Sequence, residues 1–283
     1  MAFVQLPEVR LEYFEHGHGP RTVVFVHGYQ ASARIWHRVQ RALPADAYRS
    51  IAVNNRGAGA SDAPPEERDF TIQKFASDLH ALVQTLGLTR FTLVGHSMGG
   101  TTVAQYAVDH PEQVEGLVLL DPASPNGTDL DAAAVEAVLD QRSEARRAQM
   151  ARGGGGDGID AQATADGLDA EAAAALRQLM ADIAAAPERR LRGSMRSMLT
   201  LRLGERVRAL PMPVLLAAGD RDKVIPLDNM LASWAMYPKG TGLHVWHGVG
   251  HSPNLDIPDA LAALIRTFVE KTVPARAAKA ARA

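Results

Sequence analysis

The chain has 283 residues, no cysteine and a formal net charge of -2, with 30 Lys and Arg against 32 Asp and Glu. Without cysteine it can form neither a disulfide framework nor a Cys-ligated metal cluster, and it has no thiol nucleophile. The balance of charge argues against an extended nucleic-acid-binding surface.

The first part of the chain alternates between the patterns of strands and helices. Apolar or alternating segments predict strands at residues 10–16, 22–26, 49–53, 91–94 and 117–120. Helical spacing predicts helices at residues 35–43, 72–86, with Thr71 as N-cap, and 98–110. This order predicts a mostly parallel sheet with helices on both faces. Ligands of such sheets bind at the carboxyl ends of the strands, here just after Val26, Val94, Leu120 and Ala218.

Residues 122–205 contain no pattern of a buried strand and instead predict helices at 131–150, 170–186 and 187–203. A glycine run, Gly153–Gly156, predicts a mobile loop between the first two. We interpret this insertion as a lid, with a surface excursion of no function as the alternative. The sheet pattern then resumes with strands at 213–218 and 243–246 and helices at 227–236 and 258–269, and a basic tail at 274–283 is expected to be flexible.

A possible nucleophile lies between a predicted strand and a predicted helix. Gly95-His96-Ser97-Met98-Gly99 has the pattern G-x-S-x-G. A serine on such a sharp turn stands exposed, and the flanking glycines let strand and helix pack closely. The alternative is a glycine-rich packing turn. The position of the motif favours Ser97 as a nucleophile.

Four motifs in chain order resemble the α/β-hydrolase fold family. They are His27-Gly28 after the first apolar strand, the segment Arg56–Asp62, the elbow at Ser97, and a late acid followed by a late histidine. The resemblance implies a mostly parallel sheet of about eight strands. It also implies a core domain of residues 1–121 and 206–273, a helical lid of 122–205 and a reaction that needs no metal or organic cofactor.

The resemblance also implies the partners of Ser97. A serine hydroxyl needs a general base, and His251 in Gly248–Pro253 matches the family pattern, while His247 is the rival. The acid that orients the histidine is expected at Asp222, three residues after Gly219. Asp220 would then be a loop carboxylate. Asp121, at the end of an earlier strand where some relatives carry the acid, is the alternative.

The oxyanion hole implied by the resemblance uses the backbone N–H groups of Tyr29 and Met98. His27 is expected to bond the loop rather than to act in catalysis. Asn54 departs from the family, which usually has aspartate two residues before Arg56. The substrate pocket is expected to include Gly28, Trp36 and Val224, beside Tyr29 and Met98. The lid offers further apolar side chains at Met180, Met195, Met198, Leu199 and Leu203.

These motifs favour a serine esterase or lactonase that works through an acyl-enzyme. A carbon–carbon bond hydrolase of β-diketone-like substrates is the next alternative, followed by a haloperoxidase or perhydrolase, a dioxygenase and a hydroxynitrile lyase. A non-catalytic receptor is less favoured. Serine at position 97 argues against haloalkane dehalogenase and epoxide hydrolase chemistry, for which relatives use aspartate. The partner would be a small ester, lactone or ketone, with neither nucleic acid nor membrane. No apolar run approaches the roughly 18 residues of a membrane span, so we expect a cytoplasmic protein.

Overall fold

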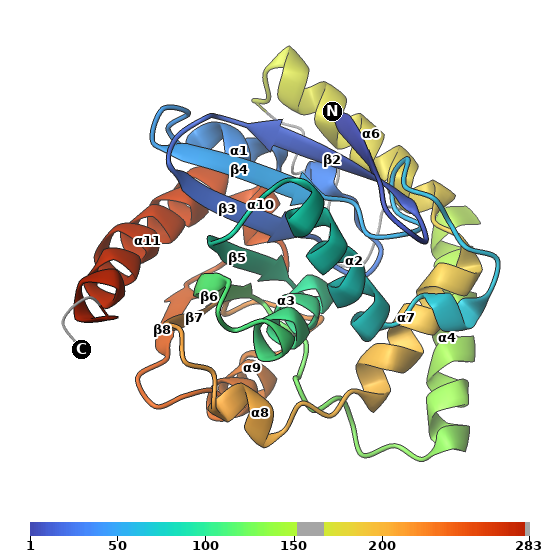
Figure 1. The fold of residues 1–283 in the computed structure, drawn as a ribbon. Coiled ribbons are helices and arrows are strands. Elements are labelled where there is room, and N and C mark those ends of the chain that lie inside the picture. The colour runs from blue at the N-terminus through green and yellow to red at the C-terminus, as the bar shows by residue number, and fades with distance from the viewer. Residues whose placement is uncertain (152–166, 281–283) are drawn as a thin grey trace.

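The structure is a computed structural model that describes residues 1–151 and 167–280. In these residues eight strands form one sheet in the order β1-β2-β4-β3-β5-β6-β7-β8 (Figure 1). β2 pairs antiparallel with both β1 and β4, and all other neighbours are parallel. The strands are β1 (Ala2–Gln5), β2 (Arg10–His16), β3 (Arg21–Val26), β4 (Tyr48–Val53), β5 (Phe91–His96), β6 (Val114–Leu120), β7 (Val214–Gly219) and β8 (Gly242–Trp246). The mostly parallel sheet is confirmed. The edge strand β1 was not predicted, because its short sequence lacks the pattern of a strand that is buried on both faces.

Helices cover both faces of the sheet. The helices are α1 (His37–Ala42), α2 (Ile72–Thr85), α3 (Met98–Asp109), α4 (Ala132–Ala151), α6 (Ala170–Ala185), α7 (Glu188–Thr200), α8 (Glu205–Arg208), α9 (Leu227–Trp234), α10 (Pro253–Asp256) and α11 (Pro258–Ala280), with short 3₁₀ helices η1 (Ala33–Trp36) and η2 (Glu67–Asp69). Thr71 caps α2 as predicted, because its side chain accepts a hydrogen bond from the Lys74 N–H at 3.1 Å. The helix expected at 35–43 divides into η1 and α1.

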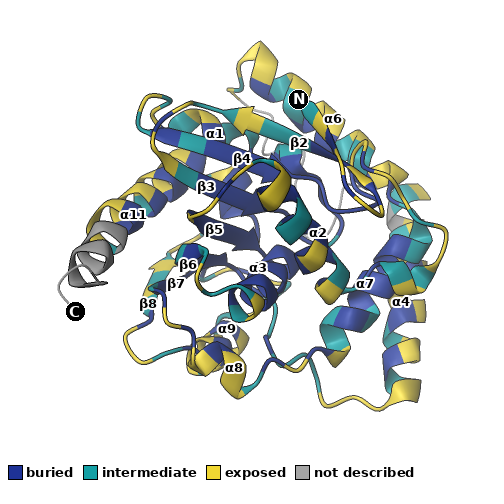
Figure 2. Ribbon diagram, viewed as in Figure 1, coloured by how far each residue is buried: buried dark blue, intermediate teal, exposed yellow. Residues whose placement is uncertain are grey.

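The alternation of side chains along β3 explains why the sheet has a core on each face. Val24 and Val26 join the cluster that α2 and α3 complete, whereas Val23 and Phe25 join the cluster of α1 and α11. Successive side chains of a strand point to opposite faces, so a strand with helices on both sides needs apolar residues throughout. Figure 2 shows most of the length of the central strands as buried, and β5 is buried throughout.

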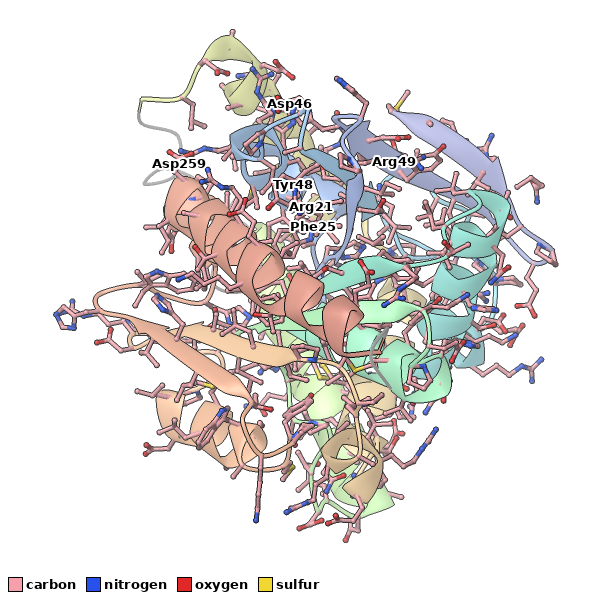
Figure 3. The ribbon with its side chains drawn as sticks, turned by 60° about the vertical axis from the view of Figure 1, so that its left-hand side comes forward. Arg21, Phe25, Asp46, Tyr48, Arg49 and Asp259 are labelled. Atoms are coloured by element: carbon pink, nitrogen blue, oxygen red, sulfur yellow. The ribbon has the colours of Figure 1, made fainter. Side chains whose placement is uncertain are left out.

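The last helix, α11, lies across the sheet. Figure 3 shows it beside the labelled Tyr48 and Phe25, which come from β4 and β3. The Tyr48 hydroxyl donates a hydrogen bond to Glu270 at 3.1 Å. The helix continues through Ala280, so most of the segment that we expected to be a flexible tail is helical in the structure. Alanine favours helix, and the expected flexibility of the tail stays a prediction.

Between β6 and β7 the described residues form helices α4, α6, α7 and α8. The first three match the predicted helices, and α8 was not predicted. α4 packs against α7 through Val135, Leu139 and Met195 (Figure 1). α7 is tied to the rest of the molecule at Ser197, whose hydroxyl accepts from the Ile72 N–H at 2.9 Å. The predicted mobile loop at Gly153–Gly156 lies outside the described residues. None of the described helices has both the length and the apolar character needed to cross a bilayer.

Candidate active site

Ser97 occupies a strained turn between β5 and α3. Its backbone has φ 54° and ψ -119°, a combination of angles that residues other than glycine rarely adopt. A Cβ at Gly95 would overlap the Gly99 carbonyl, and one at Gly99 would overlap the Val26 carbonyl. The two glycines therefore allow the close approach of strand and helix that the motif predicted. The turn aims Ser97 into a cavity.

His251 and Asp222 come together from two loops at the carboxyl edge of the sheet. Asp222 follows β7 and His251 follows β8, and the imidazole Nδ1 lies 2.7 Å from Asp222 Oδ2. The other carboxylate oxygen accepts from the N–H groups of Val224 and Ile225 at 2.7 and 2.9 Å. Burial works to raise the pKa of Asp222, but the hydrogen bonds from His251 and from these amides outweigh it and hold that pKa below its ordinary value. Asp222 is thus an anion that orients the His251 ring.

Asp121 lies beside this pair but does not bond the ring in the structure. It follows β6 with φ 41°, and its carboxylate accepts from the Gly219 N–H at 3.1 Å. Burial, reinforced by the charge of Asp222, raises the pKa of Asp121 well above its ordinary value. The carboxylate that is hydrogen-bonded to His251 is therefore that of Asp222.

The site contains three side chains whose spacing could hold a metal ion. One ligand atom from each of Asp121, Asp222 and His251 lies within 4.8 Å of the other two. However, His251 Nδ1 and Asp222 Oδ2 are already joined by a short hydrogen bond. A metal would have to break that bond and ionise Asp121 in a buried site, which opposes its raised pKa. The arrangement fits an oriented histidine better than a metal centre.

The rival histidine, His247, lies outside the site. Its side chain is 88% exposed and pairs with Asp220 at 2.7 Å. Asp220 also accepts from the Gly248 N–H, and this amide, followed by His247, lowers the pKa of Asp220. These contacts fix the turn after β8. Asp220 is thus the loop carboxylate that the sequence indicated.

The loop after β3 brings Gly28 and Tyr29 to the cavity. A Cβ at Gly28 would lie 3.2 Å from the Ser97 Cβ, so the loop backbone passes close to the elbow. His27 holds this loop, because its Nε2 accepts from the Asn55 N–H at 3.2 Å and its Nδ1 donates to the Gly28 carbonyl at 2.8 Å. Burial, followed by the charge of Arg190, lowers the pKa of His27 to about 3. His27 is a neutral side chain that bonds the loop, as expected.

Asn54, the departure from the family pattern, has a physical explanation in the structure. Its side-chain oxygen accepts from the Ala33 N–H at 2.6 Å, and its amide nitrogen donates to Glu12 Oε2 at 2.6 Å. Glu12 is buried and also accepts from the Ala60 N–H. An aspartate at position 54 would place a second carboxylate against Glu12, whereas asparagine supplies the missing donor.

Asn54→Asp is expected to lower the free energy of unfolding by about 2–4 kcal/mol at pH 7, because it replaces a buried hydrogen bond with a repulsion between carboxylates. Urea denaturation measures this change. Asn126→Asp is the matched control, because the Asn126 side-chain oxygen accepts from the Gly204 N–H and an aspartate keeps that acceptor. Equal stability of the two variants would contradict the assignment of Asn54 as a hydrogen-bond donor to Glu12.

A cavity of about 490 Å³ joins these elements. Of the residues expected to form the pocket, Gly28, Tyr29, Val224, Met195, Met198 and Leu199 line it. Trp36 does not; its ring packs against Phe25 at 4.9 Å in the core, and its neighbour Ile35 faces the cavity instead. The sequence placed a helix here but could not set its rotation. Met180 and Leu203 also pack in the core, and the buried Met98 side chain joins the cluster of α2 and α3.

Among the lining residues that the sequence did not indicate are His96, Arg142 on α4, and one side of α9. His96 stands before the nucleophile, and its Nε2 lies 2.7 Å from the His251 carbonyl. Burial, followed by the charge of His251, lowers the pKa of His96 to about 3, so this ring is neutral. Its position in the elbow motif was the available signal.

Comparison with known proteins agrees with this geometry. The family model of the alpha/beta hydrolase fold matches residues 21–258. The chain belongs to the α/β-hydrolase fold family. Among curated relatives, a fluoroacetate dehalogenase from Burkholderia sp. is 36% identical over 121 residues, which are 42% of this chain and 39% of that protein. A bifunctional epoxide hydrolase 2 from Sus scrofa is 32% identical over 138 residues, which are 47% of this chain and 25% of that protein. The matches thus span well under half the length of these two relatives.

Solved structures of the family resemble the chain over nearly its whole length. An esterase from Thermogutta terrifontis has a TM-score of 0.76 and 25% identity, and the match covers 96% of this chain and 100% of that one. An esterase from Exiguobacterium antarcticum has a TM-score of 0.77 at 23% identity, over 95% and 99% of the two chains, which shows a shared fold.

Proposed function

We propose that the chain is a serine hydrolase of carboxylic esters or lactones, in which Ser97, His251 and Asp222 form a catalytic triad. One observation carries the proposal: the strained serine of the elbow and the histidine held by a buried carboxylate line the same cavity. A nucleophile, a base and an orienting acid in this arrangement are the parts that acyl transfer requires.

In the proposed reaction, Ser97 Oγ attacks the substrate carbonyl carbon while its proton passes to His251 Nε2. The carbonyl oxygen becomes an oxyanion, which accepts from the N–H groups of Tyr29 and Met98. As the tetrahedral intermediate collapses, the carbon–oxygen bond to the alcohol breaks and His251 returns the proton to that alcohol. Water then attacks the acyl carbon while His251 takes its proton. The bond between the acyl carbon and Ser97 Oγ breaks, His251 returns the proton to Ser97 Oγ, and the acid is released. Asp222 remains ionised throughout and stabilises the imidazolium.

The nucleophile type favours ester hydrolysis over the reactions in the names of the curated relatives. A fluoroacetate dehalogenase and an epoxide hydrolase are among those relatives. In the family, these two chemistries use aspartate where this chain has Ser97. A serine attacks an acyl carbon through the oxyanion hole, which suits esters and lactones.

We also propose that residues 122–205 act as a lid. Met195, Met198 and Leu199 on α7 and Arg142 on α4 line the cavity from this segment. The aliphatic and thioether surfaces suit a substrate with a hydrocarbon part, because such side chains adapt to irregular apolar shapes. No Asp or Glu from the described part of the chain lines the cavity. A neutral or anionic ester therefore fits it better than a cationic one.

The test is covalent labelling with a fluorophosphonate probe, followed by peptide mapping. We expect one adduct, on Ser97, and its loss in Ser97→Ala, because the probe traps an activated serine hydroxyl. Hydrolysis of a series of p-nitrophenyl esters measures turnover in parallel. The control is Ser252→Ala, a second serine that lines the cavity, which should keep the Ser97 adduct. An unlabelled wild-type protein that hydrolyses no ester would refute the proposal.

A further inference from the structure

Arg190, on α7, is a fully buried arginine that the proposed reaction does not use. Its side chain is among the largest that the structure buries completely. Nη2 donates to the Ala31 carbonyl at 3.3 Å, and Nε has no hydrogen-bond partner within the described residues. No carboxylate from these residues forms an ion pair with it. A cation in this environment is costly, since burial favours the neutral form.

The guanidinium faces the loop that carries the proposed oxyanion donor. It bonds the carbonyl of Ala31, two residues after Tyr29. Its charge also acts on Tyr29 and on His27. Burial lowers the pKa of Arg190 to about 10, so the side chain is still a cation near pH 7. Arg190 thus contacts one end of the loop of residues 27–31, while the hydrogen bonds of His27 hold the other end.

The remainder of the fold makes room for this side chain. Gly57, with φ +75°, lies against Arg190: a Cβ there would come 2.9 Å from the Arg190 Cδ. Gly57 belongs to the Arg56–Asp62 segment, whose residues take no part in the proposed reaction. By contrast, the neighbouring Arg189 donates to the carbonyls of Pro64 and Ala63 at the edge of the molecule. Of these two arginines, only Arg190 is buried.

We propose that Arg190 is a positioning residue, which fixes the loop of residues 27–31 through the Ala31 carbonyl so that the Tyr29 N–H faces the oxyanion. This inference rests on the proposed function. A buried ion without a counter-ion contributes little to stability, and well-packed apolar replacements of buried ions are often neutral or stabilising. We therefore expect Arg190 to contribute to catalysis rather than to stability. A fixed hydrogen-bond donor stabilises the transition state more than it stabilises the bound substrate.

The experiment compares Arg190→Met with wild type in ester hydrolysis and thermal unfolding. We expect kcat to fall about 10- to 100-fold, because displacement of a donor by a fraction of an ångström weakens transition-state binding. KM should change less than about threefold, since the loop contacts the reacting carbonyl mainly in the transition state. The melting temperature should stay the same or rise. Arg190→Lys, which restores a buried cation that can donate to the Ala31 carbonyl, should recover part of the lost kcat.

Arg189→Met is the matched control on the same helix, and we expect it to keep wild-type kcat. If Arg190→Met does not fold, Arg190→Gln replaces it under the same criteria. An unchanged kcat, a rise in KM alone, or a fall in kcat matched by a fall in melting temperature would each overturn the inference. In all these cases wild type still hydrolyses the ester and labels at Ser97. Failure of the proposed function itself would instead remove both signals from wild type.

Discussion

Replacing Asp222 with asparagine is expected to lower kcat for an ester about 10⁴-fold. In the proposed triad, the buried Asp222 carboxylate accepts from His251 Nδ1 at 2.7 Å, which keeps the proton on that nitrogen and leaves Nε2 free to act on Ser97. An asparagine amide would present a donor to Nδ1, which selects the opposite tautomer, and it would leave the imidazolium without a counter-charge. Steady-state kinetics on a p-nitrophenyl ester measure the loss, and thermal unfolding checks that the variant is folded.

Asp121→Asn is the matched control for this prediction. Burial and the charge of Asp222 raise the pKa of Asp121 and so favour its protonated form, and an amide has the shape of a protonated carboxyl group. Asparagine also tolerates the positive φ of 41° at this position. We expect kcat to fall by no more than about tenfold. A larger loss in Asp121→Asn than in Asp222→Asn would reverse the assignment of the acid.

Acid is expected to destabilise the fold steeply below about pH 6.5, because two histidines are buried in the neutral form. Burial lowers the pKa values of His27 and His96 to about 3 in the folded chain, against an ordinary value of 6.5. Both groups are neutral in both states above pH 6.5. Between about pH 6.5 and pH 3 the unfolded chain binds their protons and the folded chain does not. The contribution of these two histidines to the free energy of unfolding is therefore fully present above pH 6.5 and is lost as the pH falls towards 3.

The loss amounts to about 1 kcal/mol per pH unit for each histidine, or on the order of 3 kcal/mol for the pair between pH 6.5 and pH 5. This is a large fraction of the roughly 5–15 kcal/mol of an ordinary domain. Urea unfolding across this pH range measures it. His27→Gln and His96→Gln should each remove about one proton of uptake on unfolding. The same pH slope in all the variants would contradict this account.

Local patterns were sufficient for the parts of the site that a short segment builds. The G-x-S-x-G motif predicted the strained turn at Ser97, because the glycines that permit it are neighbours in the chain. The cap at Thr71 was predicted for the same reason, because its hydrogen bond to the Lys74 N–H lies within the first turn of α2. The alternation of strands and helices likewise predicted the parallel sheet, since burial on both faces leaves a continuous apolar run.

The lining of the cavity was predicted less well, because it depends on how helices rotate when they pack. Ile35 and Trp36 are adjacent and both apolar, and only packing against Phe25 places the tryptophan in the core. α9 contributes to the cavity from a segment with no motif. The same limitation applies to Asn54, whose departure from the family became intelligible only when Glu12, 42 residues away, was found as its partner.

By itself, therefore, the sequence determined the fold family, the elbow and the candidate residues Ser97, Asp222 and His251. The tertiary structure decided which carboxylate orients the histidine, which rings are neutral and where the one buried arginine of α7 points. These properties arise from contacts between distant segments, such as that of His96 with the His251 carbonyl across 155 residues. Burial and neighbouring charge set the ionisation of each group, and neither is a property of a residue's position in the chain.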